Sequence, residues 1–167
     1  MRKYFLLSTV ALATMVASEA RAYDYLKLRV DATIKDATTT VPVSSLDFGT
    51  IVIDGSKVTG DITITVSSDY NSGTVTHTGS GVLAVLGAKC AKFDNTSWYP
   101  TPLNEIYHLP DTIELSGSEG NSEKLTITDL NIGGNHANPY CIGGTLNIPA
   151  YTAPDFFTGS FTFQRIY

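Results

Sequence analysis

Between residues 26 and 34 the sequence reads LKLRVDATI, and this stretch decides the fold class. Apolar and polar side chains alternate along it without interruption. The apolar ones are Leu26, Leu28, Val30, Ala32 and Ile34. Because successive side chains of a β-strand point to opposite faces, the pattern predicts a strand with one buried side and one side facing solvent.

The same period of two residues returns along the rest of the chain. It occurs at residues 62–67, 112–115, 125–128 and 160–164, and residues 82–86 form a short apolar run. Clusters rich in Gly, Asn and Ser separate these segments, as at residues 54–56, 70–73, 79–81, 117–121 and 133–135. Short strands separated by turns are typical of an antiparallel β-sandwich or barrel. We therefore expect one all-β domain.

The first 22 residues have the features of a secretory signal peptide. Arg2 and Lys3 precede an apolar run at residues 4–17, and residues 20–22 read Ala-Arg-Ala, which fits the cleavage rule. The run is shorter than the ~20 apolar residues that a bilayer-spanning helix needs, so a membrane anchor is the weaker alternative. We expect a mature domain of residues 23–167 without a membrane span, located in the periplasm, at the cell surface or outside the cell.

The charge of the chain disfavours several classes of partner. The formal net charge is −5, and the signal peptide would remove three cations and one anion, leaving about −7 on the mature domain. An acidic domain without clustered cations is a poor binder of nucleic acid or anionic lipid. We expect neither as a partner.

Two cysteines, Cys90 and Cys141, lie in the predicted mature domain. In an exported protein such a pair predicts a disulfide bond, because the compartment is oxidising. The alternative is a zinc site that uses Cys90 and Cys141 with His136 or His77, but the closely spaced ligand pairs of structural zinc sites are missing. We expect no metal and no cofactor.

Segments in three parts of the chain resemble one protein family. They are LDFGTIV at residues 46–52, YHLPDTIEL at 107–115, and GGTLNI at 143–148 followed by FTGSFTF at 157–163. Their order and spacing are similar to an uncharacterised family of exported bacterial pilin-like domains, which is itself similar to fimbrial subunits and to spore coat protein U. The resemblance implies an immunoglobulin-like antiparallel β-sandwich of Greek-key type that assembles on the cell surface.

The motif residues also have direct physical interpretations. Phe48 should anchor the core, and Gly49 should permit a bulge or a close backbone approach. Gly143 and Gly144 should permit a tight turn into a strand at residues 145–148.

The sequence offers no recognisable catalytic chemistry. His77, His108 and His136 are far apart and lie in no metal-binding pattern, and no G-x-S-x-G nucleophile motif occurs. The turn carboxylates could donate oxygens to calcium, but they form no dense ligand loop. They are Asp47, Asp54, Asp61 and Asp69. We expect a protein that is not an enzyme.

Two functions follow from these observations. The first is an exported structural or adhesive surface subunit that assembles into fimbriae by strand addition, with residues 26–34 as the donated strand. Its partners would be copies of itself or other surface subunits, assisted by a periplasmic chaperone. The same strand could instead pair within its own domain.

The second function is a monomeric secreted module for a glycan or protein ligand. Its contact surface would be Trp98, Tyr99 and Tyr107, from the proline-rich stretch at residues 94–110.

Overall fold

A computed structural model describes residues 25–36, 44–69, 74–93, 107–118, 123–135 and 138–165. This part of the chain is almost entirely β-structure, as the alternating pattern predicted, with one 3-10 turn, η1 (Gly55–Lys57). The strands are β1 (Tyr25–Asp36), β2 (Leu46–Asp54), β3 (Ile62–Val66), β4 (Val75–Thr78), β5 (Val82–Leu86), β6 (Ala91–Phe93), β7 (Tyr107–His108), β8 (Ile113–Gly117), β9 (Lys124–Asn135), β10 (Asn138–Ile148) and β11 (Phe156–Arg165).

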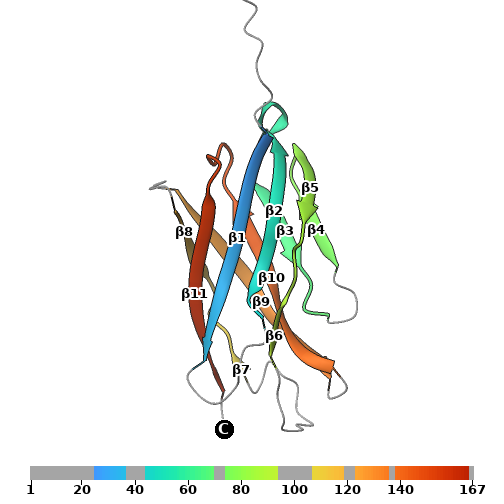
Figure 1. Cartoon of the computed structure of the whole chain (residues 1–167), viewed down its shortest axis with the longest axis vertical. Helices are drawn as coiled ribbons and strands as arrows, with labels where there is room; N and C mark the ends of the chain where they lie inside the picture. Colours follow the sequence, from blue (N-terminus) through green and yellow to red (C-terminus); the bar gives the residue numbers. More distant parts are fainter. Residues whose placement is uncertain are drawn as a thin grey trace, which may run out of the picture.

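The main sheet folds back on itself into a nearly closed, sandwich-like shape. Its strand order is β4-β3-β10-β9-β8-β11-β1-β2-β5, while β6 pairs with β10 and β7 with β11. In Figure 1, β11, β1, β2 and β5 lie in front, and β3, β9 and β10 pass behind them. Since β4 and β5 are the two ends of the path, the sheet is open along the line between them.

Four strands form the predicted Greek key. β8, β9 and β10 pair in succession, and β11 returns to lie beside β8, which gives the spatial order β11-β8-β9-β10. All of these pairings are antiparallel. The expectation of a wholly antiparallel fold is wrong at one place, because β1 pairs with β11 in parallel. These are the first and last strands of the described chain, so no hairpin connects them.

The core lies between the two layers and is built from the alternate residues of each strand. In β2, Leu46, Phe48 and Ile51 are fully buried, which confirms Phe48 as a core anchor. The lower end of the core is aromatic. There the ring of Phe93 lies 5.7 Å from that of Tyr107 and 5.4 Å from that of Phe163.

Cys90 and Cys141 form a disulfide bond, as predicted, with Cα atoms 5.6 Å apart. Cys90 directly precedes β6, and Cys141 lies opposite Lys92 in the β6–β10 pairing. Because both thiols are used, the bond excludes the alternative zinc site. It closes a loop of 51 residues and ties the lower part of β10 to β6.

Two glycines mark places where backbones approach closely. Gly49 has a φ of +72°, and a Cβ there would lie 2.1 Å from the carbonyl oxygen of Leu86. It also flanks an irregularity in the β1–β2 register, as its motif predicted. The turn expected at Gly143 and Gly144 is wrong. Both lie inside β10, where a Cβ on Gly143 would lie 2.3 Å from the carbonyl oxygen of Val66, so glycine is needed for packing against β3.

Candidate functional site

The predicted donor segment occupies the centre of the front layer. β1 is hydrogen-bonded to β2 on one side, from Tyr25 opposite Asp54 onward, and to β11 on the other, from Arg29 opposite Phe156 onward. Val30 and Ala32 are fully buried, as the alternation predicted. The side chains of Leu26, Leu28 and Ile34 lie outside the described part. In this structure the segment pairs within its own chain.

Among the described strands, β4 and β5 form the two edges of the main sheet, and these edges differ in character. On β4, Thr76, His77 and Thr78 are exposed and polar or titratable. On β5 all five residues are apolar, and the side chains of Leu83 and Leu86 are 50% and 59% exposed. An apolar, unpaired strand edge is a place where another chain can add a strand.

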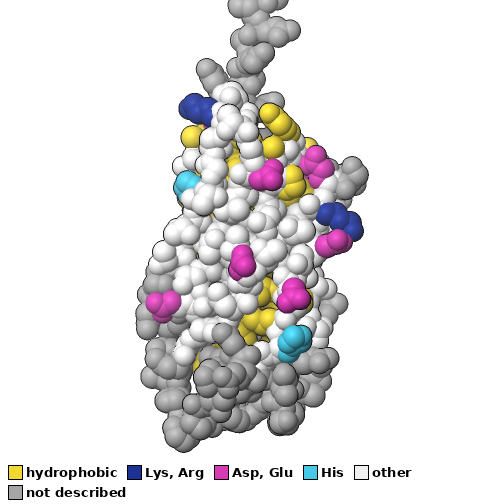
Figure 2. Space-filling model, turned by 180° about the vertical axis from the view of Figure 1, so that it is seen from behind, with side chains coloured by type: hydrophobic (Ala, Val, Ile, Leu, Met, Phe, Trp, Pro, Cys, Tyr) yellow, Lys and Arg dark blue, Asp and Glu magenta, His cyan; other side chains and the backbone are white. Residues whose placement is uncertain are grey.

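An apolar pocket opens at the upper end of the molecule, where β2 and β10 end. Its volume is about 290 Å³. Its walls include Ile53, Val58, Ile62, Ile148, Pro149 and Pro154, and Tyr151 stands at its rim. Figure 2 shows hydrophobic side chains gathered at this end of the rear face. The Tyr151 side chain is 78% exposed, the largest exposure of a large hydrophobic residue in the described chain.

The rim beside Tyr151 is a short, strained turn. Tyr151 has a φ of +65°, in the left-handed region that a non-glycine residue enters at a cost of roughly 1–3 kcal/mol. Hydrogen bonds hold the turn on both sides. The hydroxyl and the backbone N–H of Thr152 donate to the carbonyl of Pro149 at 2.8 and 3.3 Å, and the backbone N–H of Ala150 donates to Asp61 at 2.9 Å. Because residues on both sides of it are fixed, Tyr151 is held out over the pocket.

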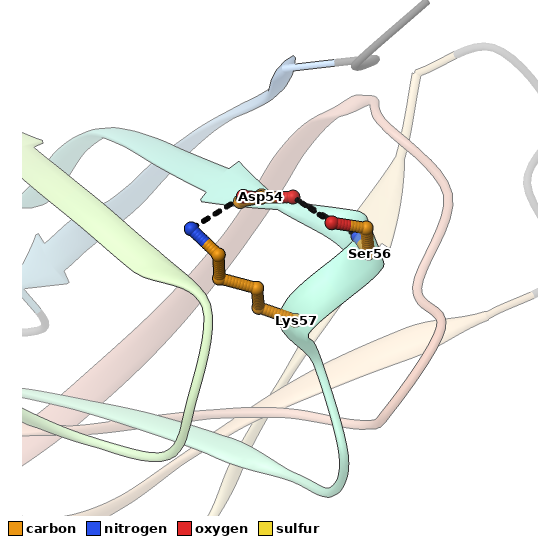
Figure 3. Close-up of polar contacts among 3 residues, drawn as sticks. All are labelled: Asp54, Ser56 and Lys57. Atoms are coloured by element: carbon orange, nitrogen blue, oxygen red, sulfur yellow. Dashed lines mark hydrogen bonds and ion pairs between the residues drawn. The ribbon is translucent and has the colours of Figure 1, made fainter. Parts of the chain in front are cut away.

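The opposite wall begins at η1, which Asp54 caps. The carboxylate of Asp54 accepts hydrogen bonds from the hydroxyl of Ser56 at 2.6 Å and from its backbone N–H at 3.1 Å, and it pairs with Lys57 at 3.1 Å (Figure 3). The hydrogen bond from the Ser56 side chain, followed by that from Lys57, lowers the pKa of Asp54 below its ordinary value of 3.8. The charge of Asp54 therefore stabilises the turn that carries Gly55 and Val58.

The structure corrects the predicted aromatic contact surface. Tyr107 is only 2% exposed, because its ring packs against Phe93 and Phe163 in the core, so it does not belong to a surface. Trp98 and Tyr99 lie outside the described residues. Within the described part of the chain, Tyr151 is an exposed aromatic residue that the sequence analysis did not single out. Its only signal is its place between Pro149 and Pro154, which marks a loop and not a binding residue.

The carboxylates considered for calcium have separate structural tasks. Asp47 accepts from the N–H of Gly49 at 2.7 Å, Asp54 caps η1, and Asp61 holds the Tyr151 turn. Asp69 is exposed near the end of its described segment. Within the described ranges, no group of three or more His, Cys, Asp or Glu residues is placed to hold a metal ion.

Of the remaining candidates, His77 and His108 are exposed on different strands, and His136 lies outside the described residues. In the part of the chain that the structure covers, no helix is long and apolar enough to cross a bilayer.

Comparison with family models, with curated proteins and with solved structures gives no match. The likeness to pilin-like domains is therefore a hypothesis carried by sequence motifs alone.

Proposed function

We propose that the chain is an exported structural or adhesive surface subunit that assembles with copies of itself by strand addition. The observation that carries this proposal is the position of β1. It is the first strand of the described chain, yet it lies inside the sheet between β2 and β11. A strand from a second copy has the same side chains and can make the same pairings.

The space between β2 and β11 that β1 occupies, here called the β1 slot, is the physical basis for an exchange of β1 strands between copies. Without β1, the facing edges of β2 and β11 lose their hydrogen-bond partners, and the core loses two fully buried side chains, Val30 and Ala32. Unpaired strand edges beside exposed apolar surface bind an incoming strand of matching pattern. The open slot therefore favours capture of a β1 strand from another copy.

The connection after β1 permits this exchange. Residues 37–45 join β1 to β2 and are the link to the rest of the domain. When extended, nine residues span about 30 Å. This length lets β1 leave its own slot and enter that of a neighbour, which is a form of domain swapping.

The disulfide supports the export part of the proposal. Disulfides persist in oxidising compartments and are rare in the cytosol. The Cys90–Cys141 bond, the signal-like N-terminus and the pilin-like motifs agree with one another. An exported, disulfide-bonded β-domain is suited to a structural role on the cell surface.

The test uses a chain that lacks residues 23–35. We expect it to be unstable alone and to be rescued by a synthetic peptide of residues 23–36, with a gain in thermal midpoint. A matched peptide that carries Val30→Asp and Ala32→Asp should not rescue it. The intact chain should form oligomers whose size grows with concentration, measured by size-exclusion chromatography and electron microscopy.

Strand addition is wrong if the shortened chain is as stable as the parent and the parent stays monomeric at high concentration. A monomeric parent would favour the second function, a secreted module for a glycan or protein ligand. The observation in favour of that function is the apolar pocket with Tyr151 at its rim. Binding on a glycan array that is lost with Tyr151→Ala would support it.

A further inference from the structure

The outer edge of β5 lacks the features that keep sheet edges from pairing with other chains. In Figure 1, β5 borders the front layer on the far side of β2 from β1, and β2 is its one partner among the described strands. Its sequence, VLAVL, contains no charged residue and no proline, which are the usual protections of an edge strand. The backbone of β5 is therefore open to pairing with another strand.

The other edge of the sheet, β4, is protected in a way that β5 is not. His77 pairs with the fully buried Ile64, so it lies on the core-facing side of β4, although its own side chain is exposed. A polar side chain on the inner side of an edge strand opposes the addition of a further strand. On the other side of β4, Thr76 and Thr78 are exposed and polar. The chain therefore favours β5 over β4 as an edge that pairs.

The side-chain pattern of β5 is complementary to itself in one register. Val85 lies opposite the fully buried Ile51 and so faces the core, and its neighbours Ala84 and Leu86 therefore face outward. When two β5 strands run antiparallel with Val85 opposite Val85, Ala84 of each copy lies opposite Leu86 of the other. Each of these side chains then meets one from the same face, as a pleated sheet requires. A shift by one residue would oppose inward and outward side chains.

Leu83 enlarges the apolar surface at this edge. The β2–β5 register shifts at this position, so Leu83 is an extra residue that has no partner on β2, and its side chain is exposed. In the register described above, it lies opposite Gly87 of the second copy. A Cβ on Gly87 would meet no atom within 4 Å, so this place has room for the leucine side chain. Leu83 can therefore cover the exposed Leu86 of the second copy.

The charges beside β5 do not oppose the approach of a second copy, although the chain as a whole is acidic. At the upper end, the N–H of Asp54 donates to the carbonyl of Gly81, and the carboxylate of Asp54 pairs with Lys57. At the lower end, Asp47 pairs with Lys89. Antiparallel pairing brings the upper pair of one copy near the lower pair of the other. Because each pair contains one cation and one anion, two copies can meet here without like-charge repulsion.

We propose that two copies of the chain pair side by side through their β5 strands, antiparallel, about a two-fold axis between the two Val85 residues. This contact goes beyond the proposed function, because β5 pairs with β2 and keeps its place when β1 strands are exchanged. It is isologous and closes at two copies, whereas β1 exchange can continue from copy to copy. One short strand makes a weak contact, but many such contacts between assembled subunits reinforce one another.

Cross-linking tests the register. Both native cysteines are bonded to each other, so an introduced cysteine is the only free thiol. Residues directly opposite in an antiparallel pair have Cα atoms about 4.5–5.5 Å apart, which a disulfide can bridge. Under mild oxidation, Val85→Cys chains should therefore form a covalent dimer. The matched control is Leu83→Cys, which is the more exposed position but lies about 13 Å along the strand from its copy in the dimer. Its dimer yield should be several-fold lower.

Charge substitutions on the outward face of β5 provide a second test that leaves the core intact. Leu86→Lys and Ala84→Glu should each raise the concentration needed for dimerisation by about tenfold or more, measured by analytical ultracentrifugation. A chain that carries both substitutions should recover dimerisation, because the two positions lie opposite each other across the contact. The matched control is Thr76→Lys on the exposed face of β4, which should leave dimerisation unchanged.

Several results would overturn the β5 contact. They are equal cross-linking of the Val85→Cys and Leu83→Cys chains, unchanged dimerisation of a folded Leu86→Lys chain, and loss of dimerisation in Thr76→Lys, which would place the contact on β4. If circular dichroism shows that Val85→Cys does not fold, the charge variants decide alone. Rescue of the shortened chain by the β1 peptide does not involve β5, so strand addition and the β5 contact can each fail while the other stands.

Discussion

Among the described glycines whose surroundings are known, Gly49 leaves the least room for a side chain. Its φ is +72°, and an added Cβ would lie 2.1 Å from the carbonyl oxygen of Leu86 and 2.7 Å from the nitrogen of Ala88. We expect Gly49→Ala to reduce the free energy of unfolding by about 2–4 kcal/mol, from backbone strain and steric overlap together. Urea unfolding of the purified chain measures this loss.

The matched control for this change is Gly60→Ala. A Cβ at Gly60 would meet no atom within 4 Å, and its backbone is not in the left-handed region. This variant should differ from the parent by less than about 0.5 kcal/mol. Equal stabilities of the two variants would contradict the close contact between Gly49 in β2 and the backbone of Leu86 in β5.

Asp54 predicts a pH dependence of stability. Its pKa is lowered in the folded state, so its charged form adds stability above the ordinary value of 3.8, and this contribution is lost as the pH falls through the lowered value. Asp54→Asn should therefore be less stable than the parent at pH 7, and the two stability curves should converge in acid. Urea midpoints between pH 2 and 7 check this prediction.

The two partners of Asp54 should contribute unequally. The hydrogen bond from the Ser56 hydroxyl is the largest single cause of the lowered Asp54 pKa, ahead of the hydrogen bond from Lys57, whose side chain is largely exposed. We expect Ser56→Ala to reduce the pH dependence more than Lys57→Gln. A larger effect of Lys57→Gln would show that the ion pair with Lys57 is the main cause of the lowered Asp54 pKa.

At the scale of the elements, the disulfide that links β6 to β10 should contribute measurably to the free energy of unfolding. For a loop of 51 residues, the chain-entropy model predicts a contribution of about 4 kcal/mol at 25 °C. Replacement of both cysteines by alanine, or reduction of the bond, should lower the free energy of unfolding by up to this amount. Identical urea curves for the oxidised and reduced chain would contradict the prediction.

The edge strand β5 predicts a change in solubility without a change in fold. Leu86 is 59% exposed on a strand whose outer edge pairs with no other described strand, and a charge on such an edge prevents pairing with other chains. Leu86→Lys should raise the concentration at which the protein precipitates, with a stability change of less than about 0.5 kcal/mol. In contrast, Ile51→Lys, at a fully buried position of β2, should prevent folding.

Local patterns predicted the strands well but could not predict every partner. Alternation identified the segments that became β1, β3, β8, β9 and β11, because a half-buried strand imposes that period, and a short apolar run indicated β5. The parallel pairing of β1 with β11 was missed, since periodicity says nothing about which strands meet. Tyr107 was misplaced for the same reason, because its burial depends on Phe93 and Phe163 from other strands.

The sequence could not predict the candidate pocket either, because the pocket also depends on which strands lie side by side. It is formed where the ends of β2 and β10 meet, and its rim depends on the backbone conformation of Tyr151. In the sequence, a Gly-Gly pair that forms a turn cannot be distinguished from one that lets two strands approach closely. Gly143 belongs to the second case, which only the neighbouring β3 backbone reveals.

For the whole molecule, the pairing of the first and last strands predicts slow folding. β1 cannot complete its pairing until β11, more than a hundred residues later, is in place. Folds dominated by such distant contacts form in milliseconds to seconds. We expect refolding of the oxidised chain to fall in this range in stopped-flow experiments, and folding within microseconds would contradict the topology.

The parallel arrangement of β1 and β11 also determines how the domain bears load. Because β1 begins at the upper end and β11 finishes near the lower end, tension applied to the two termini acts along the strands (Figure 1). The hydrogen bonds on both sides of β1 are then sheared together and cannot open one after another. Force is shared across the whole ladder, so the domain should resist stretching better than one whose termini pull a hairpin apart.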